Sequence, residues 1–266
     1  MESISFDRAA EFYDATRGHS PKVAQRISDS LHAALPERAH ILEIGVGTGR
    51  ISRPILENGL TVYGVDLSMA MMQRLLQNLD PGVTPPGLAQ ANAIRLPFAS
   101  NSLDAVLAVH VFHLIAGWQQ ALQEIQRVLR PGGSLFVGSD WRPQRSPISQ
   151  VRNEWRRIVQ ELAGRVEQPG VRTFDRLVVH LLQHGASFYQ WNAAEWTSTY
   201  NLSEYIDRLE ARIYSSTWLI PDEVFPACIQ RLRAWAQANF HSLDQEIEIP
   251  RRFVWQRYRW VDAEPG

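Results

Sequence analysis

The chain has 266 residues, 45% of them hydrophobic and 21% charged, and can therefore bury a full core as one large domain or as one domain with a lid. Its formal net charge of −1 argues against a nucleic-acid surface or an anionic membrane as the main partner. The chain has a single cysteine, Cys228, which excludes an internal disulfide. It shows no signal-peptide pattern and no apolar run near the roughly 18 residues of a membrane-spanning helix, so we expect a cytoplasmic protein.

Aromatic and charged residues are mixed in the segment 6–18, which precedes the first apolar run of the chain. A helix is then predicted from about Pro21 to Leu35, because apolar residues recur there at helical spacing. We expect this helix to pack against the core rather than to take part in chemistry. Residues 1–36 are therefore treated as a helical segment of their own.

The apolar run Ile41–Ile44 breaks at three alternate glycines, Gly45, Gly47 and Gly49, and then changes into a helix-like pattern. This predicts a strand, a tight loop and a helix whose N-terminus presents unpaired N–H groups. Glycines allow positive φ and leave no Cβ to block a ligand. The loop is therefore expected to contact a bound molecule.

Two classes of cofactor bind such loops in open α/β sheets, and the glycine spacing separates them. The dinucleotide fingerprint is Gly-x-Gly-x-x-Gly, whereas here the third glycine comes one residue early and Arg50 takes the sixth position. With Glu43 two residues before Gly45, the stretch resembles the Glu/Asp-x-Gly-x-Gly-x-Gly motif of class I S-adenosylmethionine-dependent methyltransferases. A carboxylate favours the cationic methionine end of that cofactor over a pyrophosphate. The resemblance also implies that Val46 contacts the cofactor.

A second strand, Leu60–Asp66, is predicted to end in a carboxylate beside the glycine loop. Asp66 could accept both hydroxyls of a ribose, in either cofactor class. The residues after it resemble the family's Asp-x-Ser-x-x-Met, with Ser68 as a helix N-cap and an apolar residue against the adenine. Leu67 and Met71 are the candidates for that contact, although Met71 also fits the core pattern of the next helix.

The stretch Ala91–Phe98 resembles the family's Gly-Asp-Ala-x-x-Leu-Pro-Phe, in which the acid binds the adenine amino group. Asn92 replaces that acid here, but an amide oxygen can accept the same hydrogen bond. The neighbouring backbone of Ala93 is unaffected by the change. Both residues are therefore kept as expected cofactor contacts.

The apolar run Ser102–His110 predicts the fourth, central strand, whose end should lie at the mouth of a ligand site. We expect Val109 and His110 to lie near the cofactor and His113 to be a base or a substrate contact. A histidine pair can bind a metal, but no cysteine or acidic partner accompanies this one, so no metal site is assigned.

Two further segments match the same family in order. Arg127–Gly133 resembles the Arg-x-Leu-x-Pro-Gly-Gly turn that enters the fifth strand of class I methyltransferases. The segment 6–17 resembles the opening of small-molecule methyltransferases similar to the ubiquinone and menaquinone biosynthesis enzymes, where it folds over the cofactor. That resemblance implies that Tyr13 and Arg17 contact the cofactor carboxylate or the substrate, with an ordinary amphipathic helix as the alternative.

Beyond residue 140 the resemblance fades, although eight of the nine tryptophans lie there. We expect a cofactor-binding core at 37–140, a helical insertion over the acceptor site at 141–187, and C-terminal strands and helices that complete the sheet at 188–266. The insertion is rich in arginine, and we interpret these side chains as a solvated face in preference to an anionic substrate patch. They are Arg152, Arg156, Arg157, Arg165, Arg172 and Arg176.

The predicted fold is α/β and Rossmann-like, with a doubly wound, mostly parallel seven-stranded sheet, an antiparallel last strand and a helical lid insertion. The predicted activity is methyl transfer from S-adenosylmethionine to a small-molecule acceptor by in-line displacement, with His113 and Tyr13 as candidate catalytic groups. The tryptophans favour an apolar or aromatic acceptor. We expect a monomer or homodimer that binds no nucleic acid, membrane or metal.

Two alternatives remain open. The first is a non-catalytic S-adenosylmethionine-binding or regulatory module of the same fold, against which the intact Glu43 and Asp66 argue. The second is a nicotinamide-dependent oxidoreductase, which the glycine spacing and the motifs after Asp66 disfavour.

Overall fold

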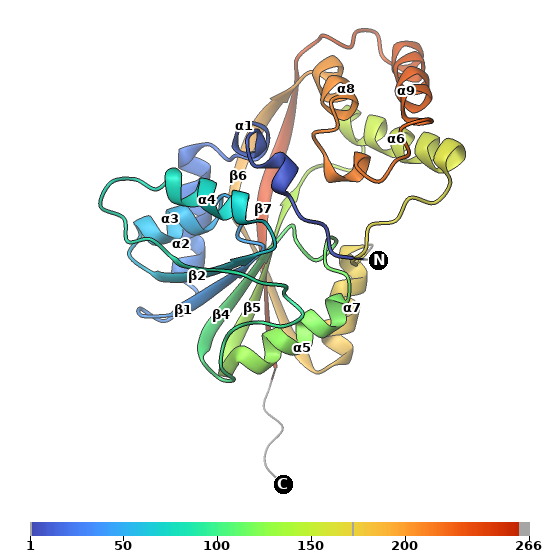
Figure 1. Cartoon of the computed structure of the whole chain (residues 1–266). Helices are drawn as coiled ribbons and strands as arrows, with labels where there is room; N and C mark the ends of the chain where they lie inside the picture. Colours follow the sequence, from blue (N-terminus) through green and yellow to red (C-terminus); the bar gives the residue numbers. More distant parts are fainter. Residues whose placement is uncertain (1, 172, 261–266) are drawn as a thin grey trace. The chain divides into compact units, whose positions relative to one another are not determined.

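The computed structural model describes residues 2–171 and 173–260 (Figure 1). It divides into two compact units, which are described separately. Within the described residues, unit 1 consists of 2–139, 169–171, 173–194 and 253–260, and unit 2 of Asp140–Gln168 and Glu195–Arg252.

A seven-stranded sheet with the order β3-β2-β1-β4-β5-β7-β6 organises unit 1 (Figure 1). The strands are β1 His40–Ile44, β2 Thr61–Asp66, β3 Gly87–Gln90, β4 Leu103–Val109, β5 Leu129–Trp141, β6 Ala186–Tyr200 and β7 Ile247–Trp260. The first five strands in the sheet order pair in parallel. The order reverses at β1 and β4, which is where open α/β sheets bind ligands.

The last strand runs against its neighbours, as predicted. Arg259 donates from Nε to the Ser134 hydroxyl at 2.9 Å, whereas nearer the other end of β5 the Cα of Gly138 faces Phe253 and Trp255. Residue numbers therefore rise along β5 while they fall along β7. The fold is the predicted Rossmann-like arrangement of a mostly parallel sheet with one antiparallel strand.

Helices cover both faces of this sheet. Those of unit 1 are α1 Tyr13–Arg17, α2 Pro21–His32, α3 Ser52–Glu57, α4 Met69–Gln77, α5 Trp118–Val128 and α7 Phe174–Gln183, together with the short 3-10 helix η1 Asp7–Ala9. On one face, α5 and α7 bury Leu122, Ile125 and Leu177 against the strands. On the other, the Trp255 indole donates to the carbonyl of Ile27 in α2 at 3.3 Å.

Local sequence signals account for the ends of several helices. Ser68 caps α4, since its hydroxyl accepts from the Met71 N–H at 3.1 Å, as predicted. After α5, the predicted Pro-Gly-Gly turn falls at the start of β5, where pairing with β4 skips from Leu129 to Ser134. Gly132 takes a φ of 76° there, which a glycine adopts without strain.

Unit 2 has a hydrophobic core of its own. It contains α6 Pro147–Ala163, α8 Leu202–Glu210, α9 Phe225–Asn239 and the 3-10 helix η2 Ser215–Thr217. Trp155 and Phe225 meet edge to face in this core, with ring centroids 5.9 Å apart. Residues 141–187 contribute to both units, because α6 packs in unit 2 and α7 in unit 1. None of the described helices is long and apolar enough to cross a membrane.

Candidate active site

A cavity of about 760 Å³, its open mouth included, lies at the carboxyl ends of β1, β2 and β4 in unit 1. Most of the side chains predicted to bind a cofactor or substrate line it: Tyr13, Arg17, Gly45, Gly47, Asp66, Leu67, Met71, Asn92, Ala93, Val109, His110 and His113. Glu43, Val46 and Gly49 do not. Phe6, the first residue of the predicted N-terminal segment, also lines the cavity, together with Ser3 and Ile4, which no sequence motif indicated.

The glycine loop depends on backbone conformations that other residues rarely adopt. Gly45, Gly47 and Gly49 have φ values of 67°, 55° and 79°. A Cβ on Gly45 would lie 2.5 Å from Val111 Cγ2, and one on Gly49 would lie 2.7 Å from Leu75 Cγ. Gly45 therefore permits close packing beneath the cavity, whereas Gly49 permits packing on α4.

Val46 faces the interior, where it packs against Met72 and Leu75. Its N–H and that of Gly45 donate to the Val65 carbonyl at 3.1 and 2.8 Å, so the loop is attached to the end of β2. Val46 and Gly49 thus support the loop from the side away from the cavity.

Asp66 joins the two backbone segments that form this end of the cavity. Its Oδ2 accepts from the Gly47 N–H at 2.9 Å, and its Oδ1 accepts from the Ser68 N–H at 2.8 Å. Burial raises the pKa of this carboxyl, and the backbone hydrogen bonds oppose that shift. Each carboxylate oxygen has further acceptor capacity, so both can bind a ligand hydroxyl as well.

Glu43 lies beneath the glycine loop instead of in the cavity. Only 3% of the residue is exposed, and the Ser52 hydroxyl at the start of α3 donates to its Oε2. Burial raises the pKa of Glu43 to about 8, against smaller opposing effects from Ser52 and Arg50. The carboxyl is therefore mostly protonated at neutral pH, and its predicted attraction for a cationic ligand stays a prediction.

Asn92 and the following backbone form a tight turn in the cavity wall. The side-chain Oδ1 of Asn92 accepts from the Ile94 N–H at 3.2 Å, and the backbone carbonyl of Asn92 accepts from the Arg95 N–H at 2.9 Å. This fixes the amide side chain while the oxygen keeps a second lone pair for a ligand donor.

His110 and His113 lie where the chain leaves β4. His110 is exposed with a φ of 52°, a left-handed conformation that turns the chain back toward the glycine loop. The carbonyl of His113 accepts from the Gly170 N–H at 3.1 Å, in the segment before α7. A Cβ on Gly170 would lie 2.0 Å from the Phe112 carbonyl oxygen, so this approach requires glycine.

Metal binding finds no support in the arrangement of these histidines. Among residues 2–171 and 173–260, no group of three or more histidine, cysteine, aspartate or glutamate side chains is placed to hold a metal ion.

The N-terminal segment, residues 3–17, closes one side of the cavity. The Ile4 N–H donates to the Leu114 carbonyl at 3.1 Å, and the Ser3 hydroxyl accepts from the Ala116 N–H at 3.0 Å. The Arg17 guanidinium carbon lies 5.5 Å from the ring centroid of Tyr13, in cation–π range. A positive charge and an aromatic ring therefore face the cavity from the same short helix.

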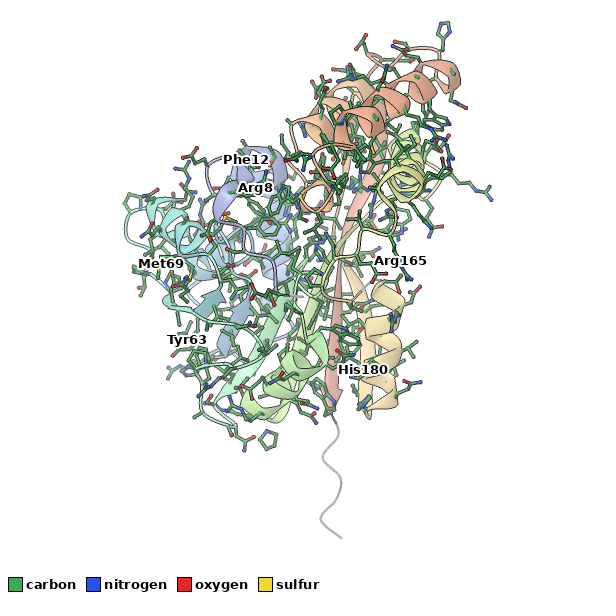
Figure 2. The ribbon with its side chains drawn as sticks, turned by 45° about the vertical axis from the view of Figure 1, so that its right-hand side comes forward. Arg8, Phe12, Tyr63, Met69, Arg165 and His180 are labelled. Carbon is green, nitrogen blue, oxygen red and sulfur yellow. The ribbon has the colours of Figure 1, made fainter. Side chains whose placement is uncertain are left out.

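Two carboxylates attach this segment to the core. Asp14 accepts from the Thr48 hydroxyl at 2.5 Å and from the Asn78 amide at 2.8 Å, and Asp7 accepts from the Ser68 hydroxyl at 2.6 Å. Figure 2 labels Arg8 and Phe12 on the segment and Met69 on α4, against which η1 packs. One carboxylate binds at the glycine loop and the other binds beside Asp66. The N-terminal segment is therefore held against the loop.

The Glu43→Gln variant tests the buried carboxyl. The folded-state pKa of about 8 exceeds the ordinary value of 4.5, so between these values the folded chain holds a proton that the unfolded chain lacks. Stability in wild type should therefore fall as pH rises through this window. The glutamine side chain does not titrate, so the melting temperature of the variant should fall less between about pH 5 and about pH 8 than that of wild type. At about pH 8 the variant should be more stable than wild type. An unchanged pH profile would contradict the assignment.

The Asp14→Ala variant tests the attachment of the N-terminal segment. Loss of two hydrogen bonds to a carboxylate should raise the open population, and trypsin cleavage at Arg8 or Arg17 should become about tenfold faster or more. Mass spectrometry of timed digests measures the rate. Glu11→Ala removes an exposed carboxylate from the same segment and is the matched control. Equal cleavage rates in both variants would show that Asp14 does not hold the segment.

Comparison with known proteins identifies the family. Residues 42–137 match the family model described as a methyltransferase domain. An uncharacterised methyltransferase of Mycobacterium tuberculosis is 31% identical over 232 residues, which cover 87% of this chain and 85% of the relative. A demethylmenaquinone methyltransferase of Renibacterium salmoninarum is 30% identical over 155 residues, which cover 56% of this chain and 63% of that enzyme.

Solved structures agree on the fold. The YcgJ protein of Bacillus subtilis superposes with a TM-score of 0.57 at 16% identity, over 89% of this chain and 98% of that protein. At this identity the likeness concerns the fold alone. Together with the relatives, the family model and the Rossmann-like sheet, it places the chain among the class I S-adenosylmethionine-dependent methyltransferases.

Proposed function

We propose that the cavity of unit 1 binds S-adenosylmethionine and that the chain transfers its methyl group to a small-molecule acceptor by in-line displacement. The observation that carries this proposal is the placement of Asp66. Its carboxylate lines the cavity at the end of β2, is fixed by the Gly47 and Ser68 N–H groups, and retains acceptor capacity on both oxygens.

The lining fits the parts of this cofactor. Asp66 would accept the ribose hydroxyls, and Asn92 with the backbone of Ala93 would bind the adenine edge. Leu67 and Met71 would lie against the adenine faces.

The glycine loop and the N-terminal segment suit the methionine part. Gly45 and Gly47 bring backbone close to a ligand without a Cβ, and the Arg17 guanidinium would attract a carboxylate. Tyr13 packs against Arg17 and would orient it. With these assignments, the negatively charged carboxylate of the cofactor would lie beside the positively charged Arg17 of the N-terminal segment.

S-adenosylmethionine supplies an electrophilic methyl group on a sulfonium, so the protein must chiefly hold the acceptor atom in line with that methyl and keep water out. Orientation of this kind can supply much of the rate. An acceptor that must lose a proton also needs a base. His113 lines the cavity, held by the Gly170 hydrogen bond to its carbonyl, and we assign it that role with Tyr13 as the second candidate.

We assign the choice of acceptor to the chain beyond residue 140, because the family model ends at residue 137 and the tryptophans concentrate after it. A small, apolar or aromatic acceptor is the proposed class. The name of the relative that acts on demethylmenaquinone supports a small-molecule acceptor.

Calorimetric titration tests the cofactor. We expect S-adenosylhomocysteine to bind and NAD to show no measurable heat, and mass spectrometry of a product screen with S-adenosylmethionine should then find methylated acceptors. NAD binding without a response to S-adenosylhomocysteine would overturn the proposal. Cofactor binding without any product across the screen would favour the non-catalytic module.

The Asp66→Ala variant should bind S-adenosylhomocysteine roughly 10- to 150-fold more weakly, because loss of a charged hydrogen-bond partner costs on the order of 1.5 to 3 kcal/mol. Calorimetry measures the affinity. Asp104→Ala is the matched control: its carboxylate pairs with Arg130 and the His40 N–H near the start of β4, away from the cavity. Equal affinities in wild type and the Asp66 variant would show that the carboxylate does not hold the ribose.

A further inference from the structure

The arginines of unit 2 fall into two groups according to their partners. One group makes ion pairs: Arg157 with Glu154 and Glu161, Arg165 with Glu167, Arg212 with Asp222, Arg231 with Glu161, Arg233 with Asp207 and Glu210, and Arg251 with Asp140. The second group, Arg142, Arg152 and Arg156, has no carboxylate partner within the part of the chain that the structure describes.

These three arginines converge on one place. Arg152 and Arg156 are four residues apart in α6 and therefore lie on the same helical face, while Arg142 is in the loop that leads into this helix. The charges of Arg142 and Arg156 both act on Arg152. The three guanidinium groups therefore lie near one another, on α6 and on the loop that leads into it.

Tyr205 of α8 completes the cluster. All three arginines act on its phenol electrostatically, and α8 packs against α6, so the phenol lies near them. Tyr205 packs against Tyr214 with ring centroids 5.7 Å apart, and this fixes its direction. The cluster thus combines planar cationic donors with a hydroxyl held in place by the core of unit 2.

Burial makes this arrangement costly without a counterion. Arg152 is half-buried between Val151 and Trp155, which are both in the core. Desolvation and the like charges of Arg156 and Arg142 lower the pKa of Arg152 to about 10. Arg157, one residue after Arg156, shows the opposite situation: it is exposed and neutralised by Glu154 and Glu161.

We propose that Arg142, Arg152, Arg156 and the Tyr205 hydroxyl form a binding site for the carboxylate or phosphate group of a small organic anion. The guanidinium fork matches the oxygens of either group in a bidentate manner, and a phenol can donate a further hydrogen bond. The expectation of a solvated face fits the ion-paired Arg157 and Arg165, whereas Arg152 is half-buried, and for this residue the proposal replaces that expectation.

The ion pairs on either side limit this site to a small ligand. Arg157, which follows Arg156 on α6, is neutralised by Glu154 and Glu161, so the positive charge does not continue along the helix as the long basic stripe that a nucleic acid requires. The site goes beyond the proposed methyl transfer.

Thermal unfolding of the full chain tests the site. Inorganic phosphate or succinate is added at ionic strength held constant with sodium chloride, so that general screening does not change. We expect at least one of the two anions to raise the melting temperature of wild type. Arg152→Gln should start at or above the wild-type melting temperature, because a desolvated and repelled charge is removed, and should lose the response to the anion.

Arg157→Gln is the matched control, since it removes a neighbouring arginine whose charge is already paired, and it should keep the response. Arg156→Gln provides a second variant in case Arg152→Gln fails to fold, with an apparent affinity about tenfold weaker or more. A response to phosphate alone identifies a phosphate ligand, and one to succinate alone a carboxylate. No response in wild type, or an equal response in wild type and Arg152→Gln, would overturn the site.

The titration with S-adenosylhomocysteine is independent of this result. Anion binding without cofactor binding would leave the arginine site standing and remove the proposed methyl transfer, whereas cofactor binding without an anion response would do the reverse.

Discussion

The cavity of unit 1 depends on the half-buried carboxylate of Asp66. Its two oxygens tie the Gly47 N–H of the glycine loop to the Ser68 N–H at the start of α4, so one side chain fixes both segments that a ligand meets at the end of β2. A carboxylate held by two backbone donors is preorganised and needs little rearrangement when a ligand hydroxyl arrives. The neighbouring carboxyl, Glu43, is placed under the same loop and serves it from below.

The N-terminal segment is attached to the same part of the cavity by hydrogen bonds that its own carboxylates accept. Asp7 binds the hydroxyl of Ser68, whose N–H binds Asp66, and Asp14 binds Thr48 within the glycine loop. Movement of the segment is therefore coupled to the residues that we assign to the cofactor. This arrangement explains how a stretch with little core of its own can form a wall of the cavity.

Motif and spacing predicted the elements that are local in sequence: the strand, loop and helix around Gly45, the N-cap at Ser68, and the antiparallel last strand. Contacts such as Gly170 with His113, or Ile4 with Leu114, join distant backbone groups and leave no periodic signal. Ion pairing on α6 is by contrast local in sequence: Arg157 has Glu154 and Glu161 three and four residues away on its own helix, whereas Arg156 has no acidic residue at either spacing.

The most direct test of the central claim is a crystal structure of the chain with S-adenosylhomocysteine. The account predicts ribose hydroxyls within hydrogen-bond distance of both Asp66 oxygens, with the adenine beside Asn92 and the amino-acid end at the glycine loop and Arg17. Density for the ligand elsewhere, or a ribose turned away from an Asp66 that still holds Gly47 and Ser68, would contradict it.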